Sequence, residues 1–217
     1  MAYAVLTEEF EVVPRLVQLR LPKEVMLDVF DRAAGERASV NSDDPMATAG
    51  NEMRRWMTRF LRQHPALKEL GWVTCAHRQI EGIRNDELKL KFVPLNTDAR
   101  TGTPSKQPMS VSERGPAVEN LIKGNVGRDQ ADLFGDELAP PPDPIDGYEL
   151  FYFCVHATEK ALSAEISRPI GLTSGFVTSF SERIILSQPG ERPGLRRVGD
   201  IAEDFAEIEK PTIIRRG

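Results

Sequence analysis

Five consecutive residues, Gln130-Ala131-Asp132-Leu133-Phe134, combine the side chains that a peptide needs to dock on another protein. Leu133 and Phe134 are adjacent, so in an extended or turn-like peptide both enter one apolar pocket, which contributes roughly 3–6 kcal/mol before ordering costs. The Gln130 amide donates and accepts hydrogen bonds and thereby fixes the register at the pocket edge. Ala131 is small enough to face away, and Asp132 adds a polar contact. The segment is therefore predicted to bind a partner. The alternative is that Leu133 and Phe134 pack on this protein's own sheet.

The same segment is similar to the peptide by which bacterial polymerase subunits and several translesion and mismatch-repair proteins dock on the ring-shaped DNA sliding clamp (DnaN). A small acidic chain that has this motif and no enzyme signature resembles the SocB toxins of SocAB toxin–antitoxin pairs. Gln130, Leu133 and Phe134 carry the resemblance, with Ala131 and Asp132 as supporting positions. The resemblance implies a protein that is not an enzyme and that blocks replication elongation by keeping the polymerase off the clamp. It also implies two further partners: an antitoxin that acts as a proteolytic adaptor, and the ClpXP protease. The alternatives are a clamp-tethered DNA repair or processing enzyme and a mobile-element accessory factor.

Two Cys-x-His pairs use both cysteines of the chain: Cys75 with His77, and Cys154 with His156. Each pair falls in a predicted strand, where residues i and i+2 project from the same face. If the two strands are neighbours, the four side chains converge as a Cys₂His₂ zinc site. Two alternatives stay open: buried cysteines beside hydrogen-bonded histidines, and a Cys–His nucleophile pair. No cofactor is otherwise required.

An arginine face is predicted on the helix that follows the loop at residues 41–45, formed by Arg54, Arg55, Arg59 and Arg62. Such a face contacts nucleic acid or an acidic partner, or is simply the solvated side of an amphipathic helix, which we favour. The sequence contains no phosphate-binding Gly-Lys-Ser/Thr loop, dinucleotide fingerprint, HExxH or nucleophile elbow. Because none of these motifs is present, the sequence motifs give no reason to expect an enzyme.

The composition narrows the class of protein. The 217 residues carry a net charge of −5, and an acidic chain gains little from neutralising DNA phosphates, so strong direct DNA binding is not expected. There is no apolar run of 18 residues, so no membrane partner is expected. The first residues form neither a basic nor an apolar signal region. Two cysteines do not make a disulfide framework. We therefore expect a cytoplasmic protein.

Hydrophobic spacing predicts helices early in the chain. Residues 10–21 read as extended, because Val17, Leu19 and Leu21 alternate with polar residues. Pro22 opens a helix that continues to about residue 33, and a second helix presents Met53, Trp56, Met57, Phe60 and Leu61 on one face. Residues 65–70 add a helical turn.

Strand patterns follow. Residues 72–80 and 87–93 read as a hairpin joined through 84–86, and residues 148–157, 162–166 and 176–186 as further strands. Between them, residues 97–147 are rich in proline and acidic residues, with only 118–122 suggesting a short helix. We therefore predict an α+β fold: N-terminal helices packed on an antiparallel sheet that a long Pro-rich acidic insertion interrupts. The predicted parts are 1–96 (helices and first strands), 97–147 (a flexible insertion that carries the binding motif), 148–194 (remaining strands of the same sheet) and 195–217 (a C-terminal tail).

Overall fold

A mixed β-sheet forms the centre of the protein. The computed structural model describes residues 3–41, 43–45, 47–77, 80–134, 147–158 and 161–193, without the side chains of residues 77, 128–134, 192 and 193. Within these residues the seven strands are β1 (Ala4–Leu6), β2 (Trp72–His77), β3 (Ile80–Asn85), β4 (Leu90–Asn96), β5 (Glu149–Ala157), β6 (Ala161–Thr173) and β7 (Phe176–Pro193). Their order across the sheet is β1-β7-β6-β5-β4-β3-β2. The helices are α1 (Glu9–Gln18), α2 (Lys23–Arg37), α3 (Thr48–Gln63), α4 (Pro65–Glu69) and α5 (Pro116–Phe134).

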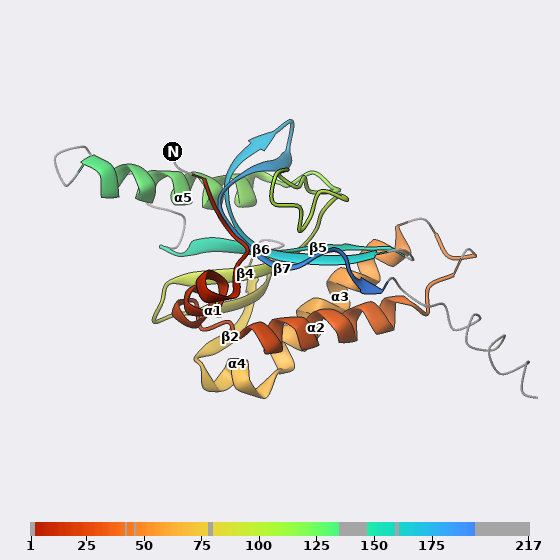
Figure 1. Ribbon diagram of the computed structural model, residues 1–217. Helices are drawn as coiled ribbons and strands as arrows, with labels where there is room; N and C mark the ends of the chain where they lie inside the picture. Colours follow the sequence, from red (N-terminus) through yellow and green to blue (C-terminus); the bar gives the residue numbers. More distant parts are fainter. Residues whose placement is uncertain are drawn as a thin grey trace, which may run out of the picture.

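Helices cover both faces of this sheet. Figure 1 shows α1 to α4 on one side and α5 on the other. The larger core lies under α1 to α4, where Phe30 and Met57 pack with Phe92 and Phe153 of the sheet. The smaller core lies under α5, where Leu121 and Ile122 join side chains of β4, β5 and β7. The predicted α+β class is confirmed.

The expectation of an antiparallel sheet is wrong at two strand pairs. Strand β1 pairs with β7 in parallel, and β4 pairs with β5 in parallel. A parallel pair needs a crossover connection, because the chain must return to the same end of the sheet. Residues 97–148 make the crossover from β4 to β5, and α5 is the helix within it.

The segment predicted to be extended near the N-terminus is helix α1. Val12 and Leu16 are buried four residues apart, which is helical spacing. The helix contains Pro14, which has no N–H to donate to the preceding turn. The alternation of Val17, Leu19 and Leu21 favours an extended reading, but packing on the sheet determines the outcome. The predicted helices at α2, α3 and α4 are confirmed.

The predicted two-stranded hairpin is in fact made of three strands. Strands β2 and β3 pair from Trp72 opposite Asn85 to His77 opposite Ile80. Strand β3 then turns into β4 at residues 86–89. Gly82 allows β3 to lie tightly on β4, since a Cβ there would stand 2.2 Å from the Phe92 carbonyl oxygen.

The predicted insertion is largely built into the fold. It contains the 19-residue helix α5, and Thr97, Thr101 and Ser110 before it are buried. A buried ion pair holds the loop before α5: Arg183 Nε donates to Glu165 at 2.8 Å. Arg183 also donates to the carbonyl oxygens of Thr103, Pro104 and Lys106 in that loop. The proline-rich part, residues 140–144, lies outside the described residues, as does the predicted tail.

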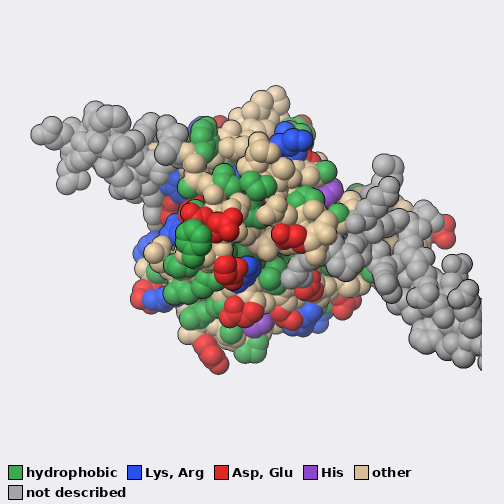
Figure 2. Space-filling model, in the orientation of Figure 1, with side chains coloured by type: hydrophobic (Ala, Val, Ile, Leu, Met, Phe, Trp, Pro, Cys, Tyr) green, Lys and Arg blue, Asp and Glu red, His purple; other side chains and the backbone are tan. Residues whose placement is uncertain are grey.

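One helix face has no cover within the described residues. Phe10, Val13 and Val17 of α1 recur at helical spacing and are 76%, 38% and 67% exposed. Figure 2 shows hydrophobic and acidic side chains next to each other over this part of the surface.

Candidate functional site

The predicted binding motif lies at the C-terminal end of α5. The helix continues to Phe134, so the backbone of Gln130–Phe134 is helical rather than extended. The side chains of residues 128–134 lie outside the described set, and their packing is therefore not assigned. Figure 1 shows the C-terminal end of α5 reaching past the strands beneath it.

A buried asparagine fixes the direction in which α5 leaves the sheet. The Asn125 amide donates to the carbonyl oxygens of Leu150 at 3.0 Å and Pro169 at 2.9 Å, and accepts from the Leu150 N–H at 3.0 Å. Arg168 donates to the Asn125 carbonyl oxygen at 2.9 Å. Helix α5 is thereby joined to β5 and β6 five residues before the motif starts.

Replacing Asn125 with alanine is expected to lower the free energy of unfolding by about 2–4 kcal/mol, because it leaves buried backbone groups of Leu150 and Pro169 without partners. Urea unfolding measures the loss, and amide exchange in α5 should become faster than in β5. Lys123→Ala, at an exposed position of the same helix, is the control and should change little. Equal stability of the Asn125 variant and the parent protein would show that the amide does not anchor the helix.

The last turns of α5 have a low intrinsic helix stability. Gly124 and Gly127 each cost about 1 kcal/mol relative to alanine in a helix interior. The last turn has no basic residue, and the sequence places Asp129 and Asp132 there, where negative charge opposes the helix dipole. The helix end that carries the motif therefore costs little to unwind.

The structure does not bring the two Cys–His pairs together. Cys75 and His77 are on β2, Cys154 and His156 are on β5, and β3 and β4 lie between these strands. Three strand spacings separate the pairs by about 14 Å, which is too far for shared zinc coordination. The hypothesis of one Cys₂His₂ site required neighbouring strands, and the strand order does not supply them.

Each cysteine is instead buried in its own place. Cys154 is fully buried in the smaller core, and burial, aided by the charge of Glu165, raises the pKa of its thiol well above the ordinary value. His156 Nδ1 lies 3.1 Å from the Thr97 carbonyl oxygen. Since the thiolate is the reactive form, this environment does not favour a nucleophile. Within the described residues, no group of three or more His, Cys, Asp or Glu side chains is placed to hold a metal ion.

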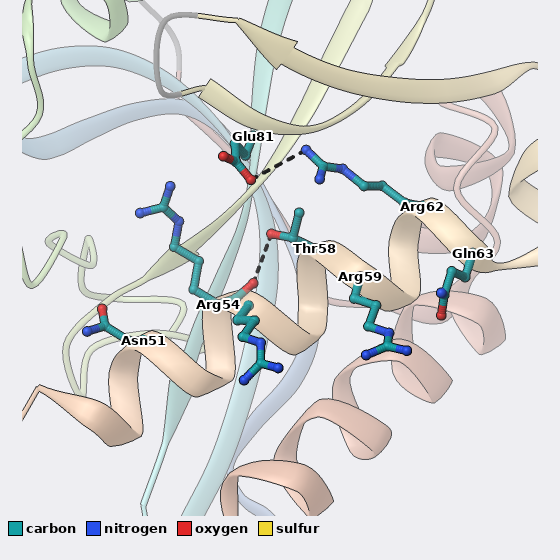
Figure 3. Close-up of a pocket in the computed structure, with 8 residues that line it drawn as sticks. Asn51, Arg54, Thr58, Arg59, Arg62, Gln63 and Glu81 are labelled. Atoms are coloured by element: carbon teal, nitrogen blue, oxygen red, sulfur yellow. Dashed lines mark hydrogen bonds and ion pairs between the residues drawn. The ribbon is translucent and has the colours of Figure 1, made fainter.

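The arginine face of α3 borders an open groove. The groove encloses about 450 Å³ and is lined by Asn51, Arg54, Arg55, Thr58, Arg59, Arg62, Gln63 and Glu81. All of these belong to α3 except Glu81, which comes from β3. Figure 3 shows Arg54 and Arg62 on the side of the helix where Glu81 lies, and Arg59 pointing toward the other side. The helical spacing predicted this face, but no local pattern indicated that β3 would close one side of it.

The four arginines differ in their partners. Arg62 donates to the carbonyl oxygens of Cys75 and Gly82 and lies 3.6 Å from Glu81. Arg55 pairs with Glu52 at 2.9 Å. Arg59 stacks over the Trp56 ring, 5.0 Å from its centroid. Within the described part of the chain, neither Arg54 nor Arg59 forms an ion pair.

A fifth arginine lies near Arg54 and was not singled out from the sequence. Arg114 precedes α5, and its Nε is buried without a hydrogen-bond partner among the described residues. Burial is the main cause that lowers the pKa of its guanidinium; Tyr152 opposes this effect, and the positive charge of Arg54 adds to it. The sequence pattern did not point to Arg114, because its loop is about 60 residues away from Arg54 in the chain.

Comparison with known proteins identifies no relative of this chain. No protein-family model, curated protein or solved structure matches this chain. None of the helices in the described ranges is both long and apolar enough to span a membrane. The motif, the helix that carries it and the arginine groove are therefore the features that bear on function.

Proposed function

We propose that this protein binds the bacterial DNA sliding clamp through Gln130–Phe134 and inhibits replication elongation by excluding the polymerase from its docking pocket. The placement of the motif on α5 is the observation that carries the proposal. Residues 130–134 end a helix that Asn125, five residues before the motif, joins to β5 and β6. A docking peptide is presented to a partner more effectively when it is attached to a fixed element.

Binding proceeds with unwinding of the last helical turns. The clamp pocket takes Leu133 and Phe134 together, and the Gln130 amide binds at its edge. Their burial contributes roughly 3–6 kcal/mol, while ordering the peptide costs part of this, so a micromolar affinity is reasonable. The acidic, glycine-containing helix end keeps the cost of unwinding low.

In this proposal the protein is a cytoplasmic toxin that acts by occupancy and not as an enzyme. Its potency follows from the fraction of clamp pockets it fills, so it depends on its abundance. The resemblance to SocB toxins extends the proposal to control by proteolysis: an antitoxin adaptor delivers the protein to ClpXP. Removing the adaptor raises the abundance of the protein and hence the occupied fraction.

The second candidate function is a clamp-tethered DNA repair or processing factor, or a mobile-element accessory factor. The arginine groove on α3 favours it, because guanidinium groups bind phosphates. Overexpression separates the two candidates. Rapid arrest of DNA synthesis supports the inhibitor, and normal growth supports the tethered factor.

Replacing Leu133 and Phe134 together with alanine should weaken clamp binding by roughly 100-fold or more, because both pocket-filling side chains are lost. Displacement of a fluorescent clamp-binding peptide measures this, and growth after induction measures toxicity. Phe10→Ala with Val13→Ala is a matched control, since it removes one aromatic and one aliphatic side chain that are exposed on α1. The control should bind and inhibit as the parent does. Growth arrest that survives loss of clamp binding would refute inhibition by occupancy.

A further inference from the structure

Helix α1 carries apolar side chains on two sides. Val12 and Leu16 are buried in the larger core. On the solvent side, four further apolar residues recur at helical spacing and are exposed, and together we call them the α1 outer face: Phe10, Val13, Pro14 and Val17. A helix at the surface of a protein normally presents polar residues to water, and one that is apolar all round is normally covered. This arrangement indicates that another segment covers the outer face.

Carboxylates surround the first turn of the outer face. Glu9 and Glu11 are the neighbours of Phe10, and Glu8 directly precedes the helix. Among the described residues Lys23 pairs with Glu9, and Glu8 and Glu11 have no ion pair. Three carboxylates and one lysine leave a net charge of −2 at this end of the helix. The segment that covers the outer face therefore needs apolar side chains next to positive charge.

A second copy of the chain fits the outer face poorly. Its four side chains expose on the order of 300–400 Å², whereas a stable interface buries about 800 Å² on each partner. Each copy carries a net charge of −5 and the same carboxylates at this face, so two copies repel each other there. A segment linked to the same chain needs less contact area, because the linkage gives it an effective concentration near a millimolar.

The residues that follow β7 contain a segment with the required chemistry. Ile213 and Ile214 stand directly before Arg215 and Arg216, so two β-branched apolar side chains adjoin two guanidinium groups. The remaining apolar residues of this part of the chain lie within 200–209, where five carboxylates accompany them. Those carboxylates have the same sign as the ones at α1 and are repelled by them. Charge therefore selects residues 213–216.

The segment can reach the outer face. Arg15 of α1 pairs with Glu182 of β7 at 2.6 Å, so the helix lies against the strand from which the segment continues. Pro193 is eleven residues beyond Glu182 and hence at most about 36 Å away along the strand. The 20 residues from Pro193 to Ile213 span up to about 66 Å when extended. The chain is therefore long enough to return to α1.

We propose that residues 213–216 of this chain bind the α1 outer face. Ile213 and Ile214 cover the apolar side chains that begin at Phe10, and the two arginines pair with Glu8 and Glu11. The contact covers the helix that directly follows the edge strand β1 and thereby holds this edge of the sheet. Figure 1 shows α1 on the opposite side of the sheet from α5, so the contact is independent of the proposed clamp binding.

Paramagnetic broadening in NMR spectra tests the contact in the full chain. A nitroxide label is attached to Gly217→Cys, and it reacts with the introduced thiol because Cys75 and Cys154 are buried. The amide resonances of Phe10 and Val17 should lose about half or more of their intensity, since an effective concentration near a millimolar half-fills a site of millimolar affinity. The resonance of Ile122 in α5, on the other side of the sheet, should keep its intensity.

Substitutions within the labelled chain test the apolar part of the contact. Ile213→Ser with Ile214→Ser removes the apolar side chains, so the broadening at α1 should largely disappear. Ile201→Ser with Ile208→Ser makes the same change in the acidic part that follows β7 and should leave the broadening as it was. Circular dichroism checks that each variant is folded.

A charge exchange tests the ionic part. Arg215→Glu with Arg216→Glu places like charges together and should abolish the broadening, and a high salt concentration should weaken it in the parent. Adding Glu8→Lys and Glu11→Lys to that variant restores opposite charges and should bring the broadening back. A merely structural effect of the arginine substitutions would not be reversed in this way.

Three outcomes contradict the proposal. One is α1 resonances of equal intensity with the label oxidised and reduced. Another is broadening that appears only between differently labelled molecules, which would assign the outer face to a second copy. The third is loss of broadening in the Ile201/Ile208 variant but not in the Ile213/Ile214 variant, which would assign it to the acidic segment. Clamp binding through residues 130–134 is measured separately, and either result stands without the other.

Discussion

Replacing Arg183 with methionine is expected to lower the free energy of unfolding by about 3–5 kcal/mol, the usual cost of breaking a buried ion pair by removing one partner. Glu165 is fully buried, and its carboxylate accepts from Arg183, from the Gly102 N–H at 2.8 Å and from Ser167 Oγ at 2.7 Å. Without Arg183 the carboxylate has no counter-charge, and three carbonyl oxygens of the 103–106 loop lose their donor. Urea unfolding measures the loss, and amide exchange near Gly102 should rise.

A double variant separates the charge from the loop contacts. Changing Glu165 and Arg183 together to methionine removes the uncompensated carboxylate, so part of the lost stability should return. Recovery should be incomplete, because the carbonyl oxygens of the loop still lack a donor. Lys123→Met, which removes an exposed ion pair with Glu119, is the control and should change little. A single Arg183 variant as stable as this control would contradict the assigned role of the pair.

Replacing Phe92 with alanine should cost about 3–5 kcal/mol, the range for a fully buried phenylalanine. Phe92 is inaccessible to solvent in the larger core. Its ring stacks on Phe153 at a centroid distance of 5.5 Å and meets Trp72 at 6.1 Å. The cavity would lie where α2 and α3 meet the sheet. Thermal and urea unfolding measure the loss.

A phenylalanine on the surface provides the matched control for this change. Phe10→Ala makes the same substitution at a side chain that is 76% exposed, so it should alter stability by only a few tenths of a kcal/mol. Phe92→Leu keeps most of the side-chain volume, so its loss of unfolding free energy should lie between those of Phe92→Ala and Phe10→Ala. If Phe92→Ala and Phe10→Ala cost the same, Phe92 would not belong to the core as described.

The helices show how far hydrophobic spacing predicts this fold. Helices α2 and α3 were predicted because their apolar residues recur every three or four positions, and those residues are buried, as in Phe30 and Met57. Helix α1 was missed, since the alternation of Val17, Leu19 and Leu21 favours a strand. Its burial on the sheet outweighs these local preferences.

Local sequence patterns did not predict which strands pair with each other. The parallel pairing of β4 with β5 joins residues that are more than fifty positions apart, and no local signal encodes such a contact. Helix α5 was predicted only at residues 118–122, because Gly124 and Gly127 lower its helix propensity. In the structure these glycines are buried.

The candidate sites were predictable as residues but not as assemblies. The motif Gln130–Phe134 was found from its residue types, yet its helical backbone was not expected. The four arginines of α3 were found from their spacing. Glu81 and Arg114 come from other segments, so only the fold reveals that Glu81 borders the groove and that the charge of Arg54 acts on Arg114. The two Cys–His pairs show the opposite case, in which matching local patterns lie on strands that do not meet.

The pairing of β1 with β7 has a consequence for how the protein forms during synthesis. Ala4–Leu6 are synthesised before their partners Glu182–Ile184, and every other described strand comes between or at these two. The sheet therefore cannot acquire β1 as its edge strand until β7 has been synthesised. Until then β1 has no partner strand in the nascent chain, and chaperones have that interval in which to bind it.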